Sequence, residues 1–155
     1  FSASLAAFHQ ITRQRTWNLS VESIGSAVQD KIMDRIIVVP SSIASSCFAD
    51  RYRNLCARML ELSALSPKEK MIGFAPHALS VHVLAHIDGW NALHSIGKRT
   101  CMQAQWEIRD IAVGIARFIR VKLPHLSRHI GPQCKVYGYC PEGEKGKNCS
   151  SKPTP

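Results

Sequence analysis

The histidines near the middle of the chain are the side chains best suited to binding a metal ion. His82 and His86 are four residues apart, so on a helix they would project from one face, as zinc-binding histidines often do. The intervening sequence, HVLAH, lacks the glutamate that the HExxH motif uses as a general base. His77 is near, but no further ligand is indicated. The pattern therefore favours partly buried, hydrogen-bonded histidines and predicts no metal site.

Motifs that activate a nucleophile or hold a nucleotide phosphate are also missing from the sequence. It contains no G-x-S-x-G turn and no glycine-rich phosphate loop. Several of its sparse carboxylates stand beside basic residues, as in Asp50-Arg51 and Arg109-Asp110, and we interpret these as solvated charges. The sequence thus predicts a non-enzymatic protein with no catalytic residue and no cofactor.

Cysteines are the third group of residues that could do chemistry. They show neither CxxC pairs nor the alternation with histidine that is typical of zinc sites, and their number is even. Oxidised pairing is therefore favoured, without a choice among the possible connectivities. Buried thiols are the alternative, because a free cysteine behaves like a small hydrophobic residue. The disulfide candidates are Cys47, Cys56, Cys101, Cys134, Cys140 and Cys149.

The predicted helix from Thr100 to Leu123 carries apolar side chains among its cationic ones. At about 100° per residue, Arg109, Arg117 and Arg120 lie opposite the broad apolar face, and Val113 lies among them. Such a mixture is typical of a surface that contacts an anionic, partly apolar partner. We therefore predict a membrane-binding or partner-binding surface that consists of Arg35, Ile37, Val38, Lys98, Arg99, Arg109, Val113, Arg117, Arg120 and Val121.

The overall charge agrees with an anionic partner. Twenty Lys and Arg against eleven Asp and Glu give a net charge of +9, although a generally cationic surface is the plain alternative. Aromatic interleaving and nucleic-acid recognition motifs are absent, so nucleic acid is not expected. No segment has the roughly 20 apolar residues that cross a bilayer, so membrane contact would be peripheral. The chain opens with Phe1, which suggests a secreted protein after signal-peptide removal.

Helical periodicity predicts the elements that would position these residues. Apolar residues three and four apart predict a first helix over 20–39 and a second whose apolar stripe runs over 43–62. The motif Ser66-Pro67-Lys68-Glu69 predicts the start of a third helix. A nearly all-apolar stretch over 78–96 predicts a central helix, and a short helical piece follows Pro124.

These elements predict an all-α fold. We expect an up-down bundle of about five helices over residues 1–130, with short connections. A Cys-, Lys-, Gly- and Pro-rich C-terminal tail over 131–155 would follow as an extension.

Several short motifs occur in a recognisable order. They are LSPKEK at 65–70, Phe74, His86, Trp90-Asn91, the turn at 97–100 and RDIAVGIARFI at 109–119. Their order resembles the abalone sperm acrosomal proteins, a family that comprises lysin and its fusagenic paralogue. The resemblance implies a right-handed bundle of five helices, without a catalytic site, that is stored in the sperm acrosomal vesicle and released at the egg.

Departures from lysin point to the fusagenic member, because the sequence has six cysteines and a Cys-bearing extension after Gly131. This implies a secreted protein that promotes sperm–egg membrane fusion, with an anionic membrane surface of egg or sperm as its partner. One alternative is lysin-like, non-enzymatic dissolution of the egg vitelline envelope through an envelope glycoprotein, with a homodimer formed by the surplus apolar residues. Another is a secreted four-helix signalling protein.

Overall fold

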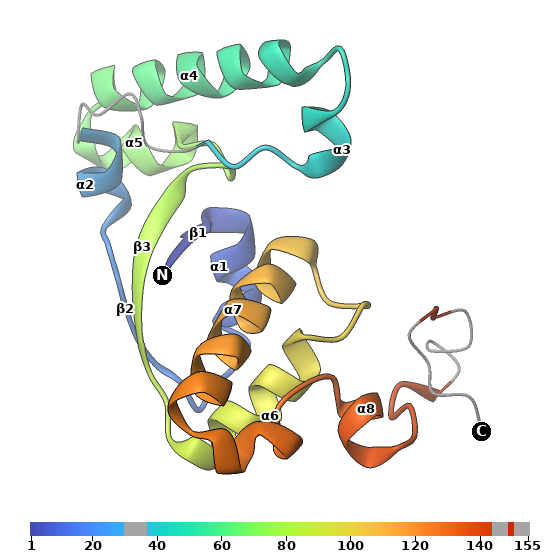
Figure 1. The fold of residues 1–155 in the computed structure, drawn as a ribbon. Coiled ribbons are helices and arrows are strands. Elements are labelled where there is room, and N and C mark those ends of the chain that lie inside the picture. Colours follow the sequence, from blue (N-terminus) through green and yellow to red (C-terminus); the bar gives the residue numbers. More distant parts are fainter. Residues whose placement is uncertain (30–36, 144–148, 151–155) are drawn as a thin grey trace. The chain divides into compact units, whose positions relative to one another are not determined.

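The computed structural model describes residues 1–29, 37–143 and 149–150, and it shows a mixed α/β fold (Figure 1). Contacts divide the chain into two compact units, one of Phe1–Thr12 and Leu19–Ala85 and the other of Arg13–Asn18 and His86–Pro155. The predicted all-α bundle is therefore wrong. The boundary near residue 130 stays a prediction. Among the described residues, no helix is both long and apolar enough to cross a bilayer.

A three-stranded sheet with the order β1-β3-β2 organises the first unit. Strand β1 (Ser2–Ser4) pairs antiparallel with β3 (Ser80–His86), and β2 (Asn18–Val21) is the third strand. Side chains alternate along β3, since Val81 and Val83 are buried whereas His82 and Leu84 are exposed. This period of two is that of a half-buried strand.

The helix expected over 78–96 is therefore wrong in its first half. Apolar content alone suggested a central helix, but buried and exposed side chains alternate over 81–84, and this segment pairs with β1 as a strand. Only the second half is helical, in α6 (Gly89–Arg99). His82 and His86, which the sequence predicts to be partly buried, instead lie exposed on this strand, and the ring Nδ1 of His82 is 2.9 Å from the hydroxyl of Ser2.

The first predicted helix, over 20–39, is also broken in the structure. Ser20 and Val21 belong to β2, and α2 (Ile24–Gln29) begins after Ser23, whose hydroxyl accepts from the backbone N–H of Ser26 at 3.0 Å. Residues 30–36 lie outside the described part. Ile37 then forms an isolated β-bridge with Leu79, so this part of the pattern is extended.

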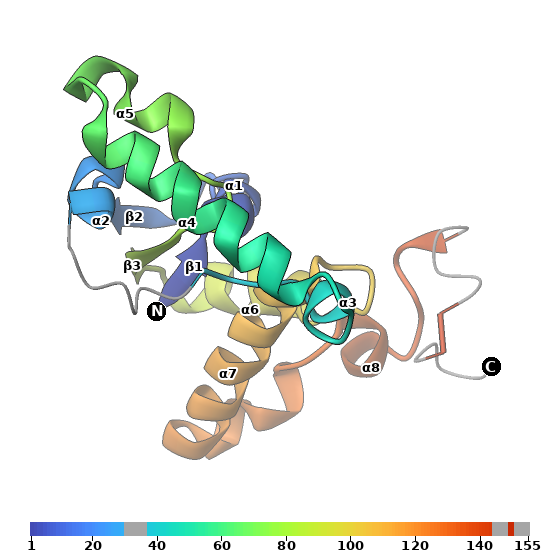
Figure 2. The same ribbon diagram turned by 90° about the horizontal axis from the view of Figure 1, so that it is seen from above.

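Helices α2, α4 (Ala49–Leu65) and α5 (Lys68–Phe74) gather at one end of the sheet (Figures 1 and 2). Short α1 (Leu5–Ile11) and α3 (Ser41–Ala44) complete this unit. The expected second helix is largely found in α4, and α5 starts directly after Pro67. The buried hydroxyl of Ser63 donates to the carbonyl of Met71 at 2.6 Å and so fastens α4 to α5.

In the second unit, α6 packs against α7 (Trp106–Lys122) around Ile96 and Ala116 (Figure 1). The 3₁₀ helix η1 (Pro124–His129) and the helix α8 (Gln133–Tyr137) follow. The predicted helix over 100–123 is thus present, but it begins at Trp106. Its start is set by Gln105, whose side chain accepts from the N–H of Ile108 at 2.9 Å.

The start of α6 gives the fold a dependence on pH that can be measured. The carboxylate of Asp88 accepts from the backbone N–H of Asn91 at 3.0 Å and also from the Asn91 side chain. These bonds, the backbone one most strongly, lower the pKa of Asp88. The folded-state pKa is below the unfolded value of about 3.9. The ionised carboxylate therefore stabilises the fold fully at pH values above about 3.9, and this stabilisation is lost as the pH falls through the folded-state pKa.

Replacing this residue, Asp88→Ala, is expected to lower the melting temperature at pH 7, because α6 loses its N-terminal cap. The difference from the unchanged chain should shrink as pH falls below about 4. Thermal unfolding followed by circular dichroism over that pH range checks this. Asp110→Ala, at an exposed position inside α7, is the control. A deficit that stays constant at low pH would contradict a role for the ionised carboxylate.

Candidate functional site

Two arginines of the second unit, Arg13 and Arg99, form the centre of a cationic cluster. Arg13 follows α1, and Arg99 is the last residue of α6. Burial lowers the pKa of the Arg99 guanidinium, and the positive charge of Arg13 lowers it further. Arg99 is half-buried whereas Arg13 is exposed, so water screens the Arg99 charge less than that of Arg13. A bound anion would relieve this repulsion.

Three side chains, Gln14, Ser95 and Trp17, are linked by hydrogen bonds to the Arg99 guanidinium, and only Gln14 contacts it directly. The amide orientation that satisfies both ends of Gln14 places its oxygen to accept from Nε of Arg99 at 3.2 Å and from Nη2 at 2.9 Å. The other end of that amide lies 3.4 Å from Oγ of Ser95. The indole Nε1 of Trp17 donates to the same Oγ at 3.1 Å. A chain of hydrogen bonds therefore runs from Trp17 to Arg99.

Local sequence explains why these side chains meet. Ser95 and Arg99 are four residues apart on α6 and so share one helix face, and Ser95 is only 1% exposed. On the other segment, the N–H of Trp17 donates to the carbonyl of Gln14 at 3.2 Å, which closes a tight turn. The turn directs Gln14 and Trp17 to the same hydroxyl. Both segments belong to the second unit.

The cluster is suited to hold a phosphate or a carboxylate. A guanidinium presents planar, paired N–H donors that match two oxygens of such an anion. The contacts through Gln14 fix the plane of the Arg99 guanidinium, which lowers the entropy lost when an anion binds. The arrangement has the features of an anion-binding site rather than of a nucleophile with its base.

The residues of the surface predicted from sequence belong to both units. Arg35 lies outside the described residues. Ile37 and Val38 are half-buried in the first unit, where the N–H of Val38 donates to the carbonyl of Ala78 at 3.0 Å. The remaining predicted residues belong to the second unit: Lys98, Arg99, Arg109, Val113, Arg117, Arg120 and Val121.

Two of the arginines on α7 make local backbone contacts. Nη1 of Arg109 donates to the carbonyl of Met102 at 3.4 Å, and Nη2 of Arg120 donates to the carbonyl of Ile130 at 2.5 Å. Arg117 is exposed, and Val121 is 75% exposed, whereas Val113 is half-buried. Lys98 is exposed beside Arg99. Of the predicted surface, only Arg99 takes part in the cluster described above.

The sequence alone did not single out Arg13, Gln14, Trp17 or Ser95 as site residues. The run Arg13-Gln14-Arg15-Thr16-Trp17 carried a usable signal, because two arginines and a tryptophan crowd into five residues between two elements. Ser95 carried none, since a serine inside an apolar helical stretch is common.

Comparisons with known proteins identify the relatives of this chain. It is 28% identical over 154 residues to a flavin-dependent thymidylate synthase of Nitratidesulfovibrio vulgaris, covering 92% of this chain and 62% of the relative. It is 30% identical over 162 aligned residues to that of Geobacter sulfurreducens, covering 94% and 64%. The chain thus spans somewhat over six tenths of the length of these curated relatives.

A solved structure shares the fold. The flavin-dependent thymidylate synthase ThyX of Helicobacter pylori, solved in complex with FAD and dUMP, superposes with a TM-score of 0.64 at 13% identity. The match covers 83% of this chain and 69% of that chain. This likeness confirms the mixed α/β architecture and overturns the bundle expected from sequence.

These findings also correct the functional predictions. The resemblance to abalone sperm acrosomal proteins is wrong, and so are the fusion and envelope-dissolving functions, the secreted acrosomal location and the membrane and egg-envelope partners. The relatives are named as synthases, so the prediction of a non-enzymatic protein is also wrong. The family model described as thymidylate synthase complementing protein matches residues 1–125 of the 155. The chain belongs to the thymidylate synthase complementing protein family.

Proposed function

We propose that the chain acts in flavin-dependent thymidylate synthesis and that Arg13 and Arg99 bind a phosphate of the nucleotide substrate, dUMP. The observation that carries the proposal is the cationic cluster, in which a half-buried guanidinium is held by Gln14 beside a second cation. The names of the relatives supply the reaction class. A phosphate monoester is the anion that such a pair binds well.

The residues of the cluster also fit the chemistry of a flavin nucleotide, whose diphosphate is anionic. Replacing the C5 hydrogen of uracil by a methyl group, with a one-carbon donor at the oxidation level of formaldehyde, requires two electrons, and a reduced flavin supplies them. For either nucleotide, the cluster offers charge and hydrogen-bond donors to the phosphate. We assign the Arg13–Arg99 pair to dUMP because one phosphate group suits one pair of guanidinium groups.

Each side chain of the cluster then has a defined task. Arg99 binds the phosphate oxygens, and Arg13 adds charge that favours the same anion. Gln14 holds the plane of the Arg99 guanidinium, and Trp17 holds Ser95 beside that amide. Partial burial of Arg99 reduces the screening of its charge by water, which strengthens its attraction to the phosphate.

A direct assay tests the proposed function. The purified chain is supplied with dUMP, FAD, a reductant and a one-carbon donor, and dTMP is sought by chromatography and mass spectrometry. We expect dTMP to form only when the flavin is present and reduced. If the chain binds both dUMP and FAD yet forms no dTMP, the synthase assignment is contradicted.

The indole of Trp17 provides a milder test of the positioning. Trp17→Phe keeps an aromatic ring but removes the N–H that donates to Ser95. One lost hydrogen bond is expected to raise the Kd for dUMP about 2- to 10-fold, measured by isothermal titration calorimetry. Trp90→Phe, at a site that is 81% exposed, is the matched control. If the Trp17 variant and the unchanged chain bound dUMP with equal affinity, Trp17 would have no role in positioning the site.

A further inference from the structure

A groove of the second unit combines aromatic rings with histidines. Its volume is about 380 Å³, and residues of α6, η1 and α8 line it. The lining consists of Trp90, Leu93, His94, His129, Val136 and Tyr137. None of these residues belongs to the Arg13–Arg99 cluster, so the groove is separate from the site proposed above.

The α6 side of the groove carries an exposed tryptophan. Trp90, Leu93 and His94 are three and four positions apart and so share one helix face. Leu93 is half-buried, whereas Trp90 is 81% exposed. An indole so open to water is unusual, because tryptophan is on average a highly buried residue. The ring of Trp90 is therefore available to a ligand.

The α8 side adds a second aromatic ring. Helix α8 packs closely against α6, since a Cβ at Gly97 would lie only 2.9 Å from Cγ of Gln133, the first residue of α8. Val136 and Tyr137, at the end of α8, complete the lining. The ring of Tyr137 stacks on that of Tyr139, with centroids 6.0 Å apart. This contact restricts the Tyr137 ring before a ligand binds, which lowers the entropic cost of stacking.

The polar part of the groove consists of two histidines. Nε of Arg128 lies 3.0 Å from Nε2 of His129, and this histidine nitrogen must accept because a guanidinium only donates. The other ring nitrogen, Nδ1, then carries the proton and is a donor. Arg128 also adds a positive charge beside that ring, and no carboxylate is among the six lining residues. These features favour a ligand with a negatively charged hydrogen-bond acceptor.

We propose that this groove binds a small, planar aromatic compound that carries a carboxylate. The ring of the ligand stacks on Trp90 and Tyr137, and the carboxylate accepts a hydrogen bond from His129. A volume of about 380 Å³ suits a small molecule, since such sites commonly measure about 300–1,000 Å³. The inference does not depend on the proposed function.

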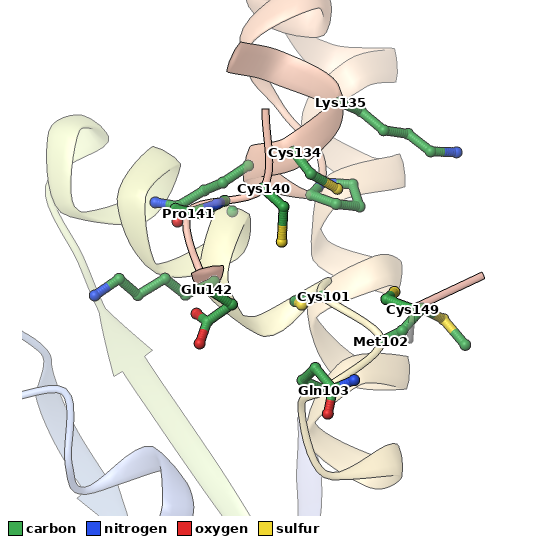
Figure 3. A pocket seen from close by; sticks show the side chains of 13 residues that line it. Cys101, Met102, Gln103, Cys134, Lys135, Cys140, Pro141, Glu142 and Cys149 are labelled. Carbon is green, nitrogen blue, oxygen red and sulfur yellow. The ribbon is translucent and has the colours of Figure 1, made fainter. Parts of the chain in front are cut away.

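Size sets this groove apart from a smaller cavity of the same unit. Figure 3 shows that cavity, whose lining includes Cys101, Cys134 and Cys140. Its volume is about 70 Å³, which is too small for an aromatic compound of this kind. All six cysteines are thiols in this structure, and the disulfide pairing expected from sequence stays a prediction.

The test is the binding of 2-naphthoate to the full chain, measured by isothermal titration calorimetry. We expect one molecule to bind per chain with a Kd of about 0.1–1 mM, as is usual for a ligand of this size. Two analogues of nearly the same shape separate the two parts of the proposal. The uncharged 2-naphthamide and the non-planar decahydronaphthalene-2-carboxylate should each bind at least about 5-fold more weakly.

Substitutions locate the bound probe. Trp90→Ala is expected to raise the Kd for 2-naphthoate at least about 5-fold, and His129→Ala about 3- to 10-fold. Phe118→Ala is the matched control and should leave the Kd unchanged, because Phe118 is a 63% exposed aromatic residue of the same unit that does not line the groove. All three positions are exposed, so the variants should fold, which circular dichroism checks.

Three results would overturn the proposal. One is a folded, unchanged chain that takes up no 2-naphthoate. The second is an unchanged Kd in folded Trp90→Ala or His129→Ala. The third is equal affinity for 2-naphthoate and one of its two analogues, which would show that the groove does not recognise the charge or the planar ring.

Discussion

Replacing Arg99 by alanine is expected to raise the Kd for dUMP about 10- to 100-fold. A hydrogen bond to a charged group is worth about 1.5–3 kcal/mol, and the guanidinium is the charged partner of the phosphate in this account. The substitution also removes Nε and Nη2 of Arg99, the two donors to the Gln14 oxygen. Isothermal titration calorimetry with dUMP gives the value directly.

Two further variants make this result specific. Arg99→Lys keeps the charge but not the planar pair of donors, so it should recover only part of the affinity. Arg117→Ala removes an exposed arginine of the same unit and should leave the Kd within about 2-fold, since surface charges are screened by salt. If Arg117→Ala weakened binding as much as Arg99→Ala, the effect would come from overall charge and not from the cluster.

Replacing Leu79 by alanine is expected to lower the free energy of unfolding by about 2–5 kcal/mol. Leu79 is 1% exposed and belongs to the core cluster of the first unit, which also contains Val81 and Val83. Truncation leaves a cavity among these side chains. Urea unfolding followed by circular dichroism measures the change.

A second leucine, Leu84, tests whether this segment is the strand of the structure or the helix that the sequence suggested. Leu84 lies on β3 but is 73% exposed, so Leu84→Ala should change the free energy of unfolding by no more than about 0.5 kcal/mol. In a helix that is apolar all round, both leucines would be buried. A loss above about 2 kcal/mol for Leu84→Ala would therefore contradict the exposed strand face.

Helices with a clear stripe and a clear start could be predicted from sequence, because local rules decide them. The helices α4 and α7 lie largely where their apolar stripes predicted them, and η1 begins at Pro124, although Leu55 and Leu62 of the α4 stripe are exposed. Strand β3 could not be found in this way, since SVHVLAH is short and apolar enough to satisfy both periods. Its state is decided by pairing with β1, whose residues lie about 80 positions away.

The Arg13–Arg99 cluster could not be predicted from the sequence for a related reason. Gln14 and Arg99 are 85 positions apart, and no local pattern links them. Arg99 was selected for its charge, but its partners depend on the tertiary fold. The sperm-protein resemblance failed because its motifs are short: LSPKEK at 65–70 is a helix-start signal and RDIAVGIARFI at 109–119 an amphipathic helical stretch, and both kinds recur in unrelated folds.

The most direct test of the central claim, that Arg99 recognises the phosphate of a nucleotide, is a thermodynamic cycle. The Kd values of dUMP and deoxyuridine, which lacks the phosphate, are measured for the unchanged chain and for Arg99→Ala. We expect that removing the phosphate weakens binding at least about 10-fold in the unchanged chain and much less in the variant. Equal losses in both proteins would show that Arg99 does not bind the phosphate and would contradict the account.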